Sequence, residues 1–336
     1  MNPRVEQALD LLRSGATPSI AEACRQSGAA KSTVSDHWKA ERGTNPKQEA
    51  TDRLPEDPDT PDLSEIPVFH LDYSELSSLH MYPMSDIHVG SPHFAEAVWD
   101  QWTDYLCHTP AVSMMFNGDG LNAAIIGAVS DVYSEKLTPN EATKVLRRKL
   151  APVNDAGILD GITRGNHEAR IWRSAGIDPL DQLADEFGVP YSPHALLLVY
   201  HVGDQEYRVF VRHGTGNGAG TVGAQANQLE RAARIFQADV FITGHSHTQL
   251  AFPRDIFGLY TPPGRKRRPL KDGKTYANRA YTINGERVKR EKMLFVSSGS
   301  FLSYEPYAAE RGFPPAHIGA PRIFLDGSKK DAHASV

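Results

Sequence analysis

Five short polar segments, far apart in the chain, each follow a hydrophobic run of strand length. They are Asp86-Ile87-His88, Gly118-Asp119, Gly165-Asn166-His167-Glu168, His213-Gly214 and Gly244-His245-Ser246-His247. Imidazole, carboxylate and amide groups are metal ligands, and a metal site needs them to converge from rigid elements. This pattern constrains the chain to a fold in which several strand ends meet.

Strands and helices are expected to alternate from Pro67 onward. The runs predicted as strands are Met81–Ser85, Val112–Asn117, Ile158–Thr163, Ala195–Val202, Tyr207–Arg212, Asp239–Thr243 and Met293–Ser297. The predicted helices are Phe94–Leu106, Asn140–Leu150, Pro179–Phe187 and Val222–Phe236. Continuous apolar strands indicate sheets covered on both faces, so the fold class is α/β, with two sheets as one option. In open α/β folds ligands bind beyond the carboxyl ends of the strands, where all five segments fall.

The spacing within the segments favours shared ligands. Asp86 and His88 are two residues apart, as are His245 and His247, and on an extended strand end such residues point to the same side. Asp119 lies between two glycines, which allow a close approach to a ligand, and its two oxygens suit a bridge between cations. Asn166 offers a neutral carbonyl oxygen. Any one of these motifs alone is commonly structural; the set together predicts a metal site.

In this order the segments resemble the motifs of the calcineurin-like metallophosphoesterase superfamily, over roughly residues 78–303. The resemblance implies a β-sandwich of two mixed sheets flanked by helices. It also implies that the first metal is held by Asp86, His88 and His247, the second by Asn166, His213 and His245, and both by Asp119. His167, facing elsewhere, would contact the scissile phosphate and protonate the leaving oxygen. Together with the N-terminal module described below, the order also resembles phosphoesterases of phages and prophages.

The implied chemistry is phosphoester hydrolysis by a metal-bridging hydroxide, with two divalent ions that also clamp the phosphate oxygens. Ligands of mixed nitrogen and oxygen without thiolate suit Mn²⁺, Fe or Zn²⁺, and we expect Mn²⁺. Arg164, Arg170 and Arg212 flank the motifs. Each is expected to bind phosphate through two parallel hydrogen bonds, and the alternative is that each pairs with a carboxylate. One departure concerns the residues after Gly118-Asp119. Many superfamily members carry an acidic residue there that orients the catalytic histidine, whereas this chain has the uncharged Asn122.

Residues 1–42 predict a small all-α unit. Val5, Leu9 and Leu12 recur at helical spacing, Thr17-Pro18 opens a second helix, and a third runs from Lys31 to about Arg42. Helix, short turn with glycine, helix resembles the helix-turn-helix of bacterial and phage regulators. The third helix would then offer a set of polar residues to a DNA groove: Lys31, Ser32, Thr33, Ser35, Asp36 and His37. The alternative is a three-helix bundle that binds protein or oligomerises, and a homodimer is one form it could take.

Residues 43–66 are expected to form a mobile linker, leaving 67–336 as the metallophosphoesterase domain. The linker holds four prolines and a net charge of −5, which equals that of the whole chain. Two cysteines in 336 residues provide no disulfide framework. Neither a signal peptide nor an apolar run of membrane-spanning length is recognisable, so we expect a cytoplasmic protein (in the host cytoplasm if phage-encoded) without a membrane partner.

An insertion at residues 261–290 separates the Gly-His-x-His segment from the Met293–Ser297 run. Between residues 265 and 290 it holds ten basic residues and two acidic ones, with Tyr276 and Tyr281 interleaved. We expect a hairpin that turns at Asn284-Gly285, overhangs the metal site and tracks nucleic-acid phosphates. Arg265, Arg267 and Arg268 are its predicted substrate contacts. The alternative is a solvated basic loop or a subunit contact.

Three functions remain open at this stage. The first is a metal-dependent nuclease or nucleic-acid phosphodiesterase, with DNA the expected partner, guided by the helix-turn-helix and the basic arm. The second is a phosphatase or cyclic-nucleotide phosphodiesterase that acts on small molecules or phosphoproteins. The third is a DNA-binding regulatory protein whose metal site is structural.

Overall fold

The structure is a computed structural model that describes two compact units, Met1–Leu63 and Ser64–Val336, each considered by itself. The described residues are 2–17, 19–42, 67–125, 133, 135–214, 221–234, 236–260, 268–269, 282–283, 287–304, 315 and 317–336. The predicted linker 43–66 lies outside them.

The first unit contains three helices, as predicted: α1 (Pro3–Arg13), α2 (Ile20–Ser27) and α3 (Lys31–Arg42). Helix α2 is capped by Ser19, whose side chain accepts a hydrogen bond from the Glu22 N–H, so this helix begins two residues after the predicted Thr17-Pro18 opening, as the capping-box spacing of Ser19 and Glu22 also indicates. Gly28 ends α2 with φ 70°, a conformation that glycine adopts without strain. A small apolar core joins the three helices: Val5, Ala8, Leu9, Ala23, Cys24 and Val34.

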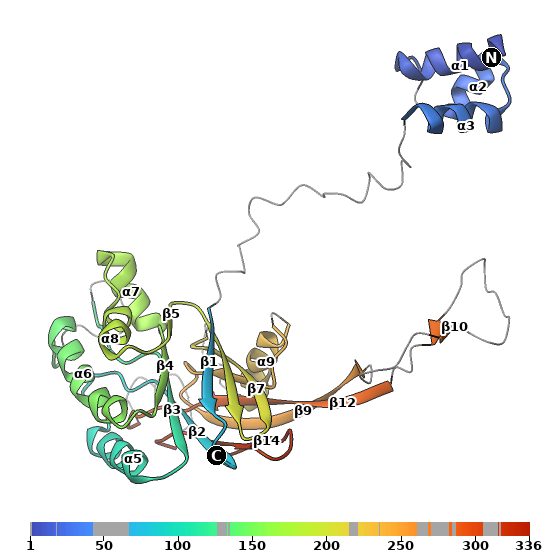
Figure 1. Cartoon of the computed structure of the whole chain (residues 1–336). Coiled ribbons are helices and arrows are strands. Elements are labelled where there is room, and N and C mark those ends of the chain that lie inside the picture. Colours follow the sequence, from blue (N-terminus) through green and yellow to red (C-terminus); the bar gives the residue numbers. More distant parts are fainter. Residues whose placement is uncertain are drawn as a thin grey trace. The chain divides into compact units, whose positions relative to one another are not determined.

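The second unit is built on two six-stranded mixed sheets (Figure 1). The first sheet has the order β1-β6-β7-β8-β12-β9, and the second has the order β14-β13-β2-β3-β4-β5. The strands of the first are β1 (Val68–Tyr73), β6 (Leu196–Val202), β7 (Gln205–Arg212), β8 (Val240–Thr243), β9 (Gln249–Tyr260) and β12 (Arg287–Ser298). The strands of the second are β2 (Ser78–Met84), β3 (Val112–Asn117), β4 (Leu159–Thr163), β5 (Tyr191–Ser192), β13 (Arg322–Asp326) and β14 (Ala332–Ser335).

Helices cover the outer face of each sheet. The helices are α5 (Glu96–His108), α6 (Pro139–Asp155), α7 (Asn166–Ala175), α8 (Pro179–Phe187) and α9 (Val222–Ala232). One core packs the second sheet against α5, α6, α7 and α8, a second lies between the sheets, and a third packs the first sheet against α9. Alternate residues of a strand serve different cores: Met114 and Phe116 face the helices, whereas Met115 faces the other sheet. The predicted class, a sandwich of two mixed sheets flanked by helices, is confirmed.

All the predicted strands and helices are present, and most of them begin or end at residues other than those predicted. Helix α8 matches its prediction, and α6 continues to Asp155. Helix α7 was not predicted, because its first turn, Asn-His-Glu, resembles the polar residues that follow a strand. Strands β1, β5, β9, β13 and β14 were not predicted either. In β1 the polar His70 and Asp72 interrupt the apolar run, since this strand lies at the sheet edge with one face exposed.

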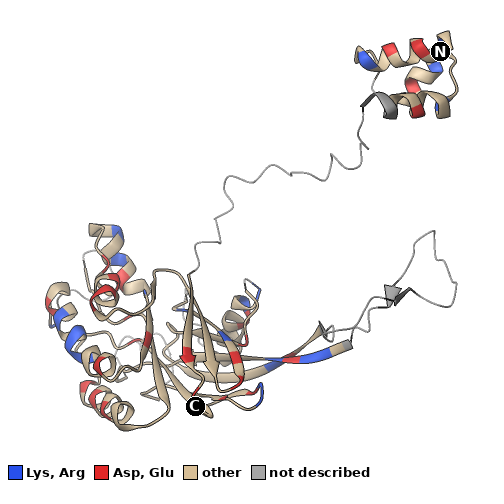
Figure 2. Cartoon of the chain, viewed as in Figure 1, with Lys and Arg blue, Asp and Glu red and all other residues tan. Residues whose placement is uncertain are grey.

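Strands β9 and β12, on either side of the predicted insertion, form an antiparallel ribbon. Strand β12 runs parallel to β8 and pairs with it only from Leu294 to Ser297. The carboxyl end of β8 leads to the predicted ligands, so the earlier part of β12, Arg287 to Met293, extends the opposite way and pairs with β9 alone. At about 3.3 Å per residue, this ribbon projects roughly 23 Å past β8. Figure 2 shows basic and acidic residues together along it. The described base of the predicted arm thus leads away from the metal ligands, whereas residues 261–267, 270–281 and 284–286 of the arm, which were expected to overhang them, lie outside the described residues.

Within the predicted insertion the structure describes one further strand pair. Strand β10 (Arg268–Pro269) pairs antiparallel with β11 (Thr282–Ile283). The predicted turn, Asn284-Gly285, lies outside the described residues.

Candidate metal centre

The predicted ligands meet at one edge of the sandwich. Strands β2, β3 and β4 are parallel, as are β7 and β8, so their carboxyl ends share an edge within each sheet. The ligands follow those ends directly: Asp86 and His88 after β2, Asp119 after β3, Asn166 after β4, His213 after β7, and His245 and His247 after β8. Both sheets therefore contribute to one cluster.

The first group of ligand atoms comes from Asp86, His88 and His247. Asp86 Oδ1 lies 3.2 Å from His247 Nε2 and 3.8 Å from His88 Nε2, and the two imidazole Nε2 atoms are 3.3 Å apart. These separations are those of atoms that share one cation, since metal–nitrogen and metal–oxygen bonds are each about 2 Å.

The second group comes from Asp119, His213 and His245. His213 Nε2 lies 3.0 Å from Asp119 Oδ2, and His245 Nδ1 lies 2.6 Å from the Asn166 side-chain oxygen. Asp119 Oδ2 is also 3.9 Å from His88 Nε2. Asp119 thus lies beside a ligand of each group, His88 in the first and His213 in the second, which is the position that a bridging carboxylate requires.

Three buried atoms of the described cluster have no hydrogen-bond partner, namely Asp86 Oδ1, His88 Nδ1 and His213 Nε2. The other polar atoms of Asp86 and His213 are hydrogen-bonded. Asp86 Oδ2 accepts hydrogen bonds from Ser85 Oγ and the His245 N–H, and His213 Nδ1 donates to the Asn117 carbonyl at 2.6 Å. Because a buried polar atom without a hydrogen-bond partner is costly, Asp86 Oδ1 and His213 Nε2 fit the role of ligands to a bound cation.

The backbone reaches this geometry through left-handed residues and not through an extended strand end. Asp86, His88, Asp119, His245 and His247 have φ between 48° and 68°. Such conformations cost of order 1–3 kcal/mol each and gather at functional sites. The predicted convergence of Asp86 with His88 and of His247 with them is present, but its predicted cause, period-two alternation, is wrong.

Charge in the cluster is strongly coupled. Burial acts to raise the pKa of the Asp86 and Asp119 carboxyls, but the surrounding imidazoles, chiefly His213, hold both well below their usual range. Burial acts to lower the pKa of His213, yet Asp119 and Asp86 raise it to about 10. A divalent cation supplies the same positive charge and competes with that proton.

His167 lies closer to the cluster than its predicted separate role implied. Its Nε2 is 3.8 Å from Asp119 Oδ2, and it forms a third metal-capable group with His88 and Asp119. Its Nδ1 donates to the Asn122 carbonyl at 2.5 Å, and Nε2 lies 3.1 Å from an Arg170 nitrogen. Burial, together with His88 and Arg170, lowers the pKa of His167 to about 3. Donation of a proton from Nε2 therefore requires a bound phosphate, whose negative charge favours the protonated ring.

Glu168 organises the site, a role that the sequence reading did not assign to it. This carboxylate is fully buried and accepts hydrogen bonds from three backbone N–H groups, those of Asp119 (3.2 Å), Leu121 (2.8 Å) and Gly165 (3.0 Å). It joins the loop after β3 to the start of α7. A signal was present, because Gly165 and Glu168 have the spacing of a helix capping box.

Asn122 does not orient His167 through its side chain. Its backbone carbonyl oxygen accepts a hydrogen bond from the His167 imidazole, while its side-chain amide nitrogen donates to Glu135 Oε2 at 2.8 Å. Glu135 was not predicted because it lies 13 residues after Asn122 in the sequence and no motif marks it.

The three arginines predicted to bind phosphate have different surroundings. Arg170 lies at the cluster beside His167. Arg164 instead pairs with Asp178 at 3.0 Å and lies over the Trp172 ring, so the alternative of an arginine paired with a carboxylate applies to it. Arg212 precedes His213, and its Nε is buried without a hydrogen-bond partner.

The remaining predicted contacts belong to the first unit or to residues whose side chains are not described. Lys31, Ser32, Thr33, Asp36 and His37 are exposed on α3, Ser35 is partly exposed, and this helix belongs to the first unit. Arg265 and Arg267 lie outside the described residues. Arg268 begins β10, and its side chain is not described.

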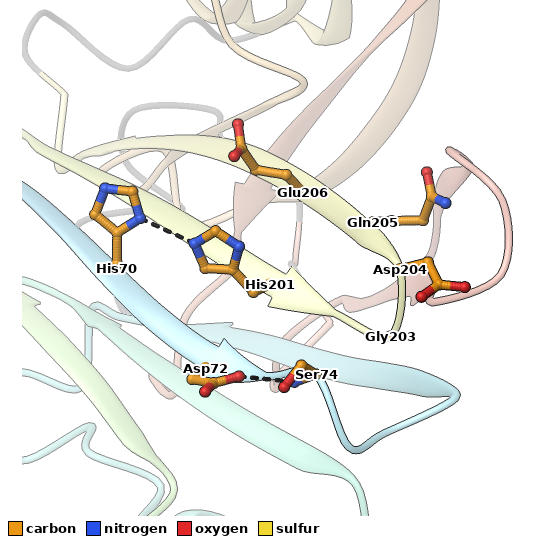
Figure 3. Close-up of a pocket in the computed structure, with 8 residues that line it drawn as sticks. All are labelled: His70, Asp72, Ser74, His201, Gly203, Asp204, Gln205 and Glu206. Carbon is orange, nitrogen blue, oxygen red and sulfur yellow. Dashed lines mark hydrogen bonds between the residues drawn. The ribbon is translucent and has the colours of Figure 1, made fainter.

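A surface hollow of about 520 Å³ lies at the end of the first sheet opposite the metal ligands. Figure 3 shows His70 and His201 pointing toward each other there, with Nδ1 and Nε2 2.9 Å apart. Its other lining residues come from β1 and the β6–β7 turn. The predicted ligands of the metal centre do not line it.

Among the described residues, no helix is long and apolar enough to cross a membrane.

No family model matches the sequence, and no curated protein matches it. Among solved structures the chain is similar to a predicted phosphoesterase from Streptococcus pneumoniae, at 13% identity and a TM-score of 0.32 over 77% of this chain and 90% of that one. A metallophosphoesterase from Sphaerobacter thermophilus gives 12% identity and 0.32, over 77% and 89%. The NAD nucleotidase of Haemophilus influenzae gives 13% identity and 0.36, over 77% and 49%. Likeness at this level carries no argument about activity, which rests on the geometry of the site.

Proposed function

We propose that this chain is a metal-dependent phosphoester hydrolase with two divalent ions. The observation that carries the proposal is the position of Asp119 between the two ligand groups, with Oδ2 3.9 Å from His88 Nε2 in the first and 3.0 Å from His213 Nε2 in the second. When bound, such ions supply an activated water and positive charge for the phosphate oxygens. We expect Mn²⁺, and the nitrogen and oxygen donors also suit Fe or Zn²⁺.

The chain's own residues have separate tasks in this proposal. Asp86, His88 and His247 would hold one ion, Asn166, His213 and His245 would hold the other, and Asp119 would contribute to both. Arg170 carries a guanidinium beside His167, where it can bind a phosphate oxygen. His167 presents Nε2 to the same space and, once protonated, can donate to the leaving oxygen.

The finer proposal is that the substrate is a nucleic acid, DNA foremost. Two features support it: the exposed polar residues of α3 in the helical first unit, and the excess of basic residues between 265 and 290. The direction of the β9–β12 ribbon, away from the ligands, favours the second candidate, a hydrolase of small phosphoesters, because nothing basic in that ribbon then covers the site.

The test uses the full chain with Mn²⁺ on labelled DNA, labelled RNA and bis-p-nitrophenyl phosphate, with Asp119→Asn as control. Cleavage of a polynucleotide that weakens with salt and with deletion of residues 1–45 supports the finer proposal. Turnover of the small diester alone, unaffected by added DNA, supports the second candidate. No turnover of any substrate by a folded, metal-loaded chain would sink both and leave the third reading, a DNA-binding protein with a structural metal site.

A further inference from the structure

Glu135 ties together two loops of the candidate metal centre. Its Oε2 accepts hydrogen bonds from the Asn122 amide at 2.8 Å and from the Ala124 N–H at 3.0 Å. Its other oxygen, Oε1, is buried without a hydrogen-bond partner. Burial raises the pKa of this carboxyl. Removing an acidic side chain from water costs free energy, and the two hydrogen bonds to Glu135 satisfy only Oε2. We therefore expect the position of Glu135 to serve the site.

The loop held by Glu135 is the one that orients His167. The carbonyl of Asn122 accepts the His167 Nδ1–H at 2.5 Å, and because a carbonyl can only accept, the proton is fixed on Nδ1. The Nε2 atom is thereby left with its lone pair toward Arg170 and Asp119. Glu135 accepts hydrogen bonds on both sides of that carbonyl, from the side-chain amide of Asn122 and from the backbone N–H of Ala124.

The structure makes room for Glu135 at Gly90. A Cβ on this glycine would lie 2.0 Å from Glu135 Oε1, and the residue has φ 105°. The Lys136 N–H donates to the Gly90 carbonyl at 2.9 Å, so the segment after Glu135 pairs with the loop that carries His88. The carboxylate is thus seated between the loop that follows β2 and the loop that follows β3.

We propose that Glu135 is a positioning residue for His167, acting through the backbone carbonyl of Asn122. Its catalytic consequence rests on the proposed hydrolase function, whereas the positioning itself does not. In the hydrolase, Glu135 keeps His167 Nε2 aimed at the phosphate and the leaving oxygen.

The direct test observes the His167 ring in the metal-free protein. With ¹⁵N-labelled histidine, the hydrogen-bonded Nδ1–H of His167 is assigned by its loss in His167→Ala. In Glu135→Ala we expect this proton to lose its downfield shift and its protection from exchange. Glu135→Gln retains an acceptor oxygen and should keep both. Glu186→Ala, which removes an exposed carboxylate paired with Arg147, is the control and should change neither. An unchanged His167 signal in a folded Glu135→Ala protein overturns the proposal.

The kinetic test separates positioning from general stability. Glu135→Ala should lower kcat by about 10- to 100-fold, part of the ~10²–10⁴ that a placed proton-transfer group provides, with KM and Mn²⁺ affinity within about twofold. Glu135→Ala added to His167→Ala should cost nothing further. Additive losses, or a loss of Mn²⁺ affinity, would also overturn the proposal. If the wild-type chain hydrolyses nothing, the hydrolase function fails, and the His167 signal still decides the role of Glu135.

Discussion

Gly165 is the position where a single methyl group should dismantle the metal centre. A Cβ at this residue would lie 2.1 Å from Asp119 Oδ1 and 2.2 Å from the Asp119 backbone nitrogen. Ordinary contact begins near 3.4 Å, so the loop carrying Asp119 must move by roughly 1.3 Å. Backbone atoms cannot swing aside as the end of a side chain can. The same shift strains the bonds from Glu168 to both loops.

The expected cost of Gly165→Ala has two parts. Overpacking of this kind lowers the free energy of unfolding by about 1–3 kcal/mol. A displacement of about 1 Å at a catalytic group costs on the order of 100-fold in rate. A cation present at a free concentration 100 times its Kd stabilises the fold by about 2.7 kcal/mol. This gain should vanish in the variant because Asp119 lies beside ligands of both groups.

The assay is thermal unfolding with and without Mn²⁺, together with diester hydrolysis. Gly223→Ala is the matched control: it lies in α9, a Cβ there meets nothing within 4 Å, and it should leave the Mn²⁺ response unchanged. If Gly165→Ala kept the full Mn²⁺-dependent stabilisation, the reasoning about Asp119 would be refuted.

Two further substitutions test the buried acids. Glu168→Gln should lower the free energy of unfolding by about 2–3 kcal/mol, since an amide NH₂ replaces an acceptor of backbone N–H groups; a loss under 0.5 kcal/mol in urea unfolding would contradict this. Asp160 is buried beside Tyr73 and Tyr200, and burial raises its pKa to about 6. The unfolded chain therefore releases this proton first, and stability falls by about 3 kcal/mol as the pH rises from 4 to 6. Asp160→Asn should remove that fall, whereas parallel pH curves would show that Asp160 ionises normally.

The ligands of the metal centre could be predicted because each follows an apolar strand run, and parallel strands bring their carboxyl ends to one edge. The local cause could not. Left-handed conformations at Asp86, His88 and His245 depend on how the loops from two sheets fit together, and no residue pattern marks them. These side chains lie together as predicted, but the predicted cause, period-two alternation along an extended strand end, was incorrect.

Long-range contacts explain the other differences. Glu168 had a local signal in the capping-box spacing, but its bonds to Asp119 and Leu121 depend on the packing of α7 against the loop after β3. Glu135 had no signal at all. The basic arm was predicted to lie over the metals because it follows His247 in sequence, whereas the parallel register of β12 with β8 directs the described β9–β12 ribbon away from the ligands.

The central claim is that two cations share Asp119. The most direct measurement is Mn²⁺ stoichiometry, by equilibrium dialysis and elemental analysis, on the wild-type chain and on Asp119→Asn. Two tightly bound Mn²⁺ ions per wild-type chain, with both weakened together in the variant, is the expected result. One ion or none in the wild type, or loss of a single ion in Asp119→Asn with the other unaffected, would contradict it.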